Sequence, residues 1–126
     1  MTERELLERT KQFALRVFKL VGALPETIHG KTVAAQLIRS GTSVAANYRA
    51  ACRARSKPDF VAKLGIVEEE ADESAFWLDL IIQTGLLNPR TVTPLLAEAG
   101  ESVAIMASSK KTATKSQIAN RKSAIG

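Results

Sequence analysis

Four basic residues lie close together near the middle of the chain, at spacings that suit binding to phosphate groups. Arg49, Arg53 and Lys57 follow one another at every fourth position, and Arg55 adds another cation. On a helix this spacing places three side chains along one face, where each guanidinium can hold a phosphate through two hydrogen bonds. The alternative is that these residues form ion pairs with the acidic helix that follows. An antiparallel turn at Ser56 would place few acids opposite Arg49 and Arg53, which strengthens the phosphate-binding interpretation and leaves the ion-pair alternative open.

The residue types that most enzymes use are scarce. The chain has one histidine, His29, in a stretch expected to be a loop, and one cysteine, Cys52. Cys52 falls on an apolar stripe, where a lone thiol usually acts as a small core residue. The sequence has no phosphate-binding loop, no nucleophile elbow and no Cys-x-x-Cys motif. We therefore expect a protein that is not an enzyme and binds no cofactor or metal.

A cluster of acidic residues between Glu68 and Glu73 offers the remaining candidate for metal chemistry. Glu70 and Glu73 have the i, i+3 spacing found in di-iron bundles, but such sites also need histidines on facing helices. No histidine is expected on a helix here. A solvated acidic face is therefore favoured over a metal site.

The net charge of +5 on 126 residues is distributed unevenly along the chain. Residues 1–57 carry a net charge of +7, residues 58–109 carry −7, and residues 110–126 carry +5. Such asymmetry can mark a surface that binds nucleic acid, but basic and acidic helices packed side by side in one fold are the favoured explanation for most of these charges. No apolar run is long enough to span a membrane, and the single cysteine suits a reducing compartment. We expect a cytoplasmic protein with no membrane partner.

Apolar residues recur at helical spacing in four segments, and no segment alternates like a strand. The expected helices cover about residues 2–21, 32–55, 57–84 and 91–110. Short loops between long helices favour antiparallel neighbours. The sequence thus predicts an all-α fold, an up-down-up-down antiparallel four-helix bundle over residues 1–111. Residues 112–126 are expected to form a flexible basic C-terminal tail.

Three residues of the central helices lead to expectations about how these helices pack. Gly41 lies in the middle of a helix at a cost of about 1 kcal/mol, which close approach of another helix would offset; a break in the helix is the alternative. Antiparallel packing would place Arg39 opposite Glu73, as an ion pair between helices. Asn47 would lie opposite Glu70, among apolar and small residues, where it should be hydrogen-bonded and fix the helix register.

The stretches 36–51, 56–64 and 70–78 together resemble the four-helix-bundle proteins of the 23S rRNA intervening-sequence family. The resemblance covers about 50 residues of the two central helices, with compatible lengths on either side. Two departures are Ala50, where relatives often have glutamate, and Glu68-Glu69-Glu70, where they often have Leu-Lys-Glu. The residues that fit the family pattern are Arg39, Ser43, Asn47, Ser56, Phe60, Lys63, Glu70, Glu73, Trp77 and Leu78.

The resemblance implies an up-down bundle that assembles as a ring-shaped homopentamer and has no established enzyme activity. It also implies kinship with the accessory variability determinant of diversity-generating retroelements, a basic pentamer that binds nucleic acid and a reverse transcriptase. The more acidic third helix of this chain weakens the case for nucleic-acid binding by that face.

Two functions therefore compete: an oligomer that associates with RNA or DNA through basic surfaces, and a protein-binding scaffold with no nucleic-acid role. Apolar residues on more than one side of the helices favour a homo-oligomer. Scarce aromatic residues indicate that nucleic acid would be bound through its phosphates and with little sequence specificity. The candidate nucleic-acid-binding residues are Arg49, Arg53, Arg55, Lys57, Lys110, Lys111 and Lys115.

Overall fold

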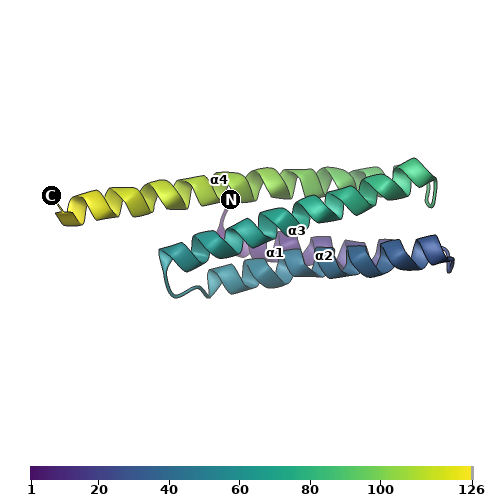
Figure 1. Ribbon diagram of the computed structural model, residues 1–126, viewed down its shortest axis with the longest axis horizontal. Coiled ribbons are helices and arrows are strands. Elements are labelled where there is room, and N and C mark those ends of the chain that lie inside the picture. The colour runs from purple at the N-terminus through teal and green to yellow at the C-terminus, as the bar shows by residue number, and fades with distance from the viewer. Residues whose placement is uncertain (126) are drawn as a thin grey trace.

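The computed structural model describes the backbone of residues 1–125, and the side chains of residues 1–116, 118 and 119. Within this range the chain forms four α-helices and no strand: α1 (Glu3–Val21), α2 (Ile28–Cys52), α3 (Lys57–Thr84) and α4 (Pro89–Ile125). The helices lie side by side along one long axis (Figure 1). The predicted all-α four-helix bundle is confirmed.

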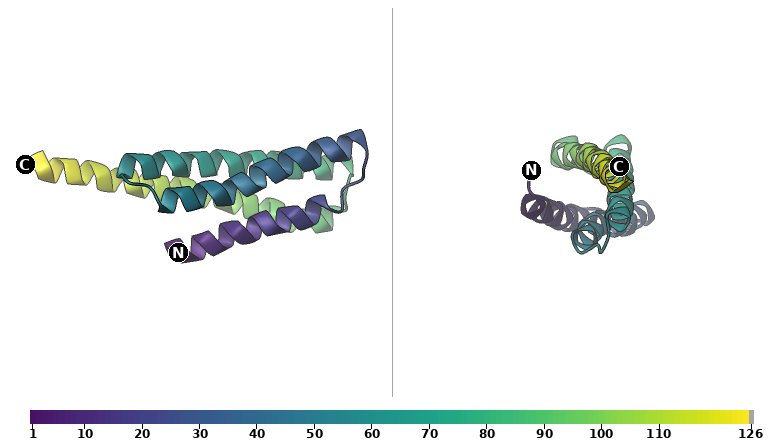
Figure 2. Two further views of the ribbon diagram at one scale, coloured as in Figure 1. Left: turned by 90° about the horizontal axis from the view of Figure 1, so that it is seen from below. Right: turned by 90° about the vertical axis from the view of Figure 1, so that its left-hand side faces the viewer.

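Helices that follow one another in the chain pack together, and α1 also contacts α4. Within the described range α1 does not pack on α3, nor α2 on α4, so these two pairs lie on the diagonals of the bundle. An end-on view shows the four helices around a common centre (Figure 2). Apolar side chains from every helix fill that centre; fully buried examples are Phe13, Val17, Leu37, Val44, Leu64, Leu78, Ile81, Val92 and Met106.

Gly41 allows α1 and α2 to approach each other closely. A Cβ atom built on Gly41 would lie 2.8 Å from a methyl carbon of Val17, closer than such atoms approach in real structures. Val17 is fully buried, so it has no free space into which to move. Close approach of the neighbouring helix therefore explains this glycine, and α2 continues through it without a break.

The second helix begins earlier than the sequence predicted. The Thr27 hydroxyl accepts a hydrogen bond from the Gly30 N–H at 3.1 Å and caps the helix, so α2 starts at Ile28. The absence of a side chain on Gly30 is essential here, because a Cβ would lie 1.9 Å from the Pro25 carbonyl oxygen. The expectation that His29 lies in a loop was wrong: His29 is exposed in the first turn of α2.

The fourth helix differs from the prediction at both ends. It starts at Pro89, ahead of the expected residues 91–93, and it runs to Ile125 where an end near Lys110 was expected. Ala113 is buried, which shows that the helix still packs on the bundle beyond Lys110. Residues 112–125 are therefore helical, and α4 extends past the turn between α2 and α3 (Figures 1 and 2). Gly126, the last residue of the expected tail, lies outside the described residues.

Candidate nucleic-acid interface

The turn between α2 and α3 determines where the central basic residues lie. α2 ends at Cys52, and Arg53 forms its C-terminal cap. The Ser56 hydroxyl then accepts a hydrogen bond from the Asp59 N–H at 3.2 Å and starts α3. The expectation that Arg49, Arg53 and Lys57 share one helix face was therefore wrong, because the chain reverses direction between them.

The C-terminal part of α4 lies beside this turn. The Lys57 ammonium is 3.4 Å from the Ser116 hydroxyl, which joins the first residue of α3 to α4. This contact brings cations from the turn and from α4 to the same end of the bundle. We call this group of five residues the basic end; it consists of Arg53, Arg55, Lys57, Lys111 and Lys115.

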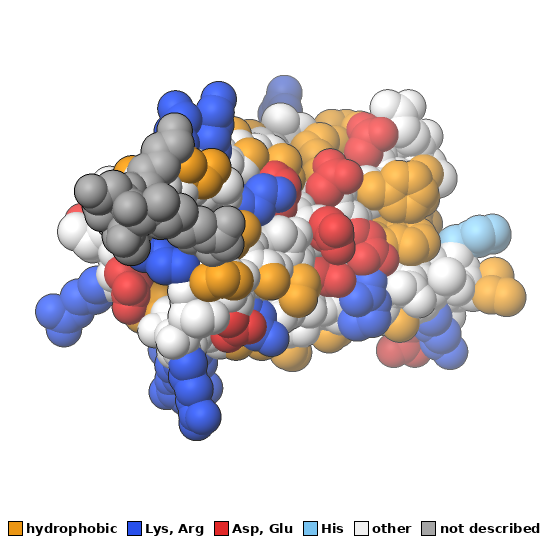
Figure 3. Space-filling model, turned by 60° about the vertical axis from the view of Figure 1, so that its left-hand side comes forward, with side chains coloured by type: hydrophobic (Ala, Val, Ile, Leu, Met, Phe, Trp, Pro, Cys, Tyr) orange, Lys and Arg blue, Asp and Glu red, His pale blue; other side chains and the backbone are white. Residues whose placement is uncertain are grey.

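The cations of the basic end are exposed to solvent and are free of ion pairs within the described part of the chain. Two acids lie nearby. Glu3 lines a shallow pocket together with Arg55 and Lys57, and Asp59 lies in the first turn of α3. Positive charge still exceeds negative charge at this end, and Figure 3 shows Lys and Arg side chains projecting from it into solvent.

Two candidate cations lie outside the basic end. Arg49 lines a groove of about 970 Å³ between α1 and α2, where it is accompanied by Arg4 and Lys11 and by two acids, Glu5 and Glu8. Lys110 points toward α3 instead, and forms an ion pair with Glu68 at 3.1 Å. Its charge is thus already balanced. The structure therefore places five of the seven predicted residues at one end of the bundle, whereas Arg49 lines the groove between α1 and α2 and Lys110 is paired with Glu68.

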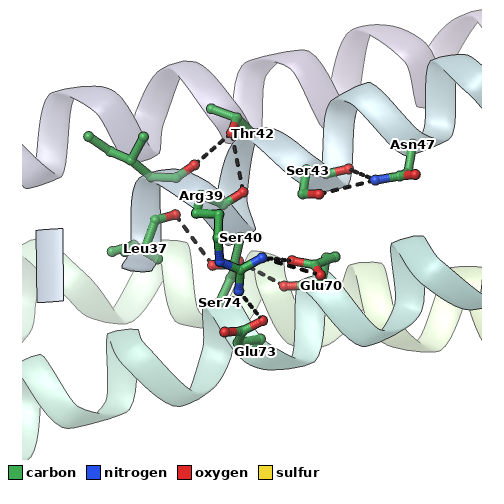
Figure 4. A network of polar contacts seen from close by, with 10 residues as sticks. Leu37, Arg39, Ser40, Thr42, Ser43, Asn47, Glu70, Glu73 and Ser74 are labelled. Atoms are coloured by element: carbon green, nitrogen blue, oxygen red, sulfur yellow. Dashed lines mark hydrogen bonds and ion pairs between the residues drawn. The ribbon is translucent and has the colours of Figure 1, made fainter. Parts of the chain in front are cut away.

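Arg39 occupies a different environment, in a polar layer between α2 and α3. Its guanidinium forms ion pairs with Glu70, at 3.1 Å, and with Glu73 (Figure 4). The hydrogen bond from Arg39 holds the pKa of the Glu73 carboxyl below its usual value, an effect that partial burial only partly opposes. The two helices are thus linked across their surface by an arginine whose charge is matched by acids.

Asn47 lies close to this layer but does not join the two helices. Its side-chain NH₂ donates to the Ser43 carbonyl oxygen at 2.9 Å and to the Ser43 hydroxyl at 3.1 Å, both within α2 (Figure 4). The residue is half-buried. These hydrogen bonds from the side-chain NH₂ stay within α2, so they do not support the predicted role of Asn47 in fixing the helix register.

Two polar contacts were not anticipated from the sequence. Ser40 and Ser74 are fully buried, and their hydroxyl oxygens lie 2.9 Å apart across the interface of α2 and α3. Arg9 on α1 forms a two-bonded ion pair with Glu98 on α4, at 2.6 and 2.8 Å, and also contacts Glu101. A serine among small residues and an arginine among other charges give no signal in sequence that would distinguish these contacts.

The described residues contain no group of three or more His, Cys, Asp or Glu side chains arranged to hold a metal ion. In the same part of the chain, none of the helices combines the length and the apolar character that crossing a membrane requires. What the surface offers instead is charge, and the concentration of unpaired cations at the basic end is its clearest feature.

Comparisons with known proteins agree with this architecture. A family model described as 23S rRNA-intervening sequence protein matches residues 2–119. A crystal structure of a protein of unknown function from the S23 ribosomal protein family of Bacteroides thetaiotaomicron is 30% identical and superposes with a TM-score of 0.78, covering 88% of this chain and 99% of that chain. No curated protein matches the sequence. Because the family model spans nearly the whole chain, this protein belongs to the 23S rRNA-intervening sequence protein family.

Proposed function

We propose that this protein is a non-catalytic, cytoplasmic homo-oligomer that associates with RNA or DNA through the basic end. The observation that carries the proposal is the meeting of five exposed, unpaired cations from the α2–α3 turn and α4. Each cation placed against a phosphate releases bound counterions, and this release drives association.

The residues around the basic end support recognition of phosphate over recognition of bases. Phe60, which lines a pocket with Arg55 and Lys57, is half-buried against the core, and Tyr48 is buried. The exposed Phe18 and Phe76 lie late in α1 and α3, away from the α2–α3 turn. Base-stacking surfaces need exposed aromatic side chains close to the cations. We therefore expect duplexes and single strands of different sequence to bind with similar affinity.

Self-association is part of the proposal because large apolar side chains remain exposed on the single chain. Leu15 and Phe18 on α1 and Ile66 and Phe76 on α3 are each more than a third exposed. Contact between copies would cover them. The resemblance described above favours a ring of five copies, and a ring would present several basic ends to one nucleic acid.

The test is a salt titration of binding to a generic duplex and to a single strand. A triple variant, Arg53→Ala/Arg55→Ala/Lys57→Ala, removes charge from the turn, and a double variant, Lys111→Ala/Lys115→Ala, removes charge from α4. The slope of log affinity against log salt should fall by nearly one for each phosphate that the variant no longer neutralises. The triple variant should therefore flatten the slope more than the double variant.

A matched control removes the same kind of charge at the opposite end of the bundle. Lys31→Ala/Arg90→Ala changes two exposed cations, at the start of α2 and of α4, and should leave the slope as it is. Equal losses in the control and in the basic-end variants would mean that net charge alone drives binding. If the full chain shows no binding at low salt, the nucleic-acid proposal fails and a protein-binding scaffold becomes the favoured function.

A further inference from the structure

The outer face of α1 combines exposed apolar side chains with positive charge. Leu15 is 50% exposed and Phe18 is 53% exposed, and their i, i+3 spacing places them side by side on the helix. Lys11, Arg16 and Lys19 surround them and are also exposed. Glu8 lies one helical turn before Lys11, and no acidic residue follows it in the sequence before Glu26. We call this surface the α1 face.

The outer face of α3 has the same apolar character and the opposite charge. Ile66 is 37% exposed and Phe76 is 56% exposed. The acids that lie between and beside them on this surface are Glu69, Asp72 and Asp79, all exposed. We call this surface the α3 face. Figure 3 shows acidic side chains bordering apolar ones on one side of the molecule.

The acids of the α3 face are not paired with cations in the part of the chain that the structure describes. Arg39 pairs with Glu70 and Glu73, and Lys110 pairs with Glu68, so these three acids are matched by cations of the same molecule. Glu69, Asp72 and Asp79, in contrast, form no ion pair within the described residues. The same is true of Lys11, Arg16 and Lys19 on the α1 face.

The two faces point away from each other. Since α1 and α3 lie on a diagonal of the bundle and do not contact each other, one copy is unable to bring its own two faces together. Two copies can do so, because the α1 face of one matches the α3 face of the next in both apolar content and charge.

We infer that a second copy of this chain is the partner of these surfaces, with the α1 face of one copy packed on the α3 face of its neighbour. This inference rests on the self-association proposed above and specifies how it occurs. The contact joins different surfaces on the two copies, so each copy keeps one free face for a further neighbour. Repetition of such a contact closes into a ring when the rotation permits and forms a filament when it does not.

Charge distinguishes this arrangement from the alternatives. A symmetric dimer through two α1 faces would place cations against cations, and one through two α3 faces would place acids against acids, both at a cost. A nucleic acid on the α3 face would meet like charge. Unlike charges meet across the contact only when the two faces come from different helices.

The experiment uses charge reversal on the full chain, with mass measured by light scattering at micromolar concentration. Arg16→Glu/Lys19→Glu makes both faces acidic, and Asp72→Lys/Asp79→Lys makes both faces basic. Each variant alone should shift from several times 13.6 kDa toward the monomer mass. The chain that carries all four changes again places unlike charges at every contact, whatever the number of copies, and should assemble by itself.

A matched control, Lys31→Glu/Arg90→Glu, reverses two exposed cations outside both faces and should keep the wild-type mass. Helical content by circular dichroism verifies that every variant is folded. If the wild type is a monomer, the proposed self-association fails and this inference with it. If the wild type is an oligomer that the reversals do not weaken, or that the four changes together do not restore, only the pairing of the α1 and α3 faces is overturned.

Discussion

Arginines occupy two contrasting environments in this bundle. Arg9 and Arg39 each cross from one helix to another and meet two carboxylates, whereas Arg53 and Arg55 project from the α2–α3 turn without an ion pair in the described chain. The residue type and the net charge are the same. The difference lies in whether a neighbouring helix presents acids at the same height along the bundle.

Cations that are paired with acids stabilise the fold, whereas unpaired cations are available to a binding partner. A cation already matched by an acid gains less from a phosphate, because binding would first break the existing pair. Substitutions of paired arginines should therefore change stability, and substitutions of unpaired arginines should change binding.

The largest effect on stability is expected for Arg9→Met. This change leaves Glu98, whose side chain is 16% exposed, without its cation. Hydrogen bonds to charged groups contribute about 2 kcal/mol, so the free energy of unfolding in urea should fall by about that amount. Arg4→Met, which removes an exposed cation from the same helix, should change the unfolding free energy by less than about 0.5 kcal/mol. Equal losses in the two variants would contradict the comparison.

A smaller effect is expected when the polar layer between α2 and α3 is reversed. Arg39→Glu places three carboxylates together and should lower the melting temperature, and adding Glu73→Arg should recover part of the loss because an unlike pair forms again. Arg55→Glu, the matched change at the basic end, lies in the turn outside both helices and should leave the melting temperature nearly unchanged while weakening nucleic-acid binding. Equal destabilisation by Arg55→Glu and Arg39→Glu would show that paired and unpaired arginines do not differ in their contribution to stability.

The dependence of stability on pH tests whether the ion pair with Arg39 lowers the pKa of Glu73. Its pKa is lower in the folded protein than in the unfolded chain, so its stabilising contribution is complete above the unfolded pKa and is lost as the pH falls through the folded pKa. Glu73→Gln should therefore be less stable than the wild type near pH 6, with a gap that narrows below about pH 4. Urea unfolding between pH 3 and pH 7 measures the gap; a constant difference would show that Arg39 does not set this pKa.

The smallest effect is expected for Asn47→Leu. Because the amide bonds only to Ser43 of its own helix, its loss should change the unfolding free energy by less than about 0.5 kcal/mol. Ser74→Ala removes a hydroxyl from the buried pair with Ser40 and serves as the positive comparison, with an expected loss of about 1 kcal/mol. A large loss for Asn47→Leu would restore its predicted role in helix register.

The features that followed from sequence are those set by local chemistry. The expected turn at Ser56 lies where α3 begins, and Gly41 indicated close helix packing. The antiparallel turn then placed Arg39 opposite Glu73 by counting residues along two helices. Each of these inferences needs only the helical repeat and the position of one turn.

The structural features that the sequence did not predict depend on contacts between residues that are far apart in the chain. Thr27 starts α2 because the chain folds back over Gly30, and α4 continues beyond Lys110 because Ala113 finds a buried position on the bundle. The grouping of the basic end has the same origin. Arg49 and Lys57 are close in sequence but lie on different helices, while Lys57 reaches Ser116 from 59 residues away.

The weak packing between the first and last helices has a consequence for the order in which the molecule opens. α1 and α4 contact each other less than any other pair of packed helices, and the Arg9–Glu98 bond joins residues 89 positions apart. The other helix pairs are joined by short loops, whereas closing α1 on α4 costs more chain entropy and yields less packing in return. Amide hydrogens of α1 should therefore exchange with solvent sooner than those of α3, through a partial opening that leaves α2, α3 and α4 packed together.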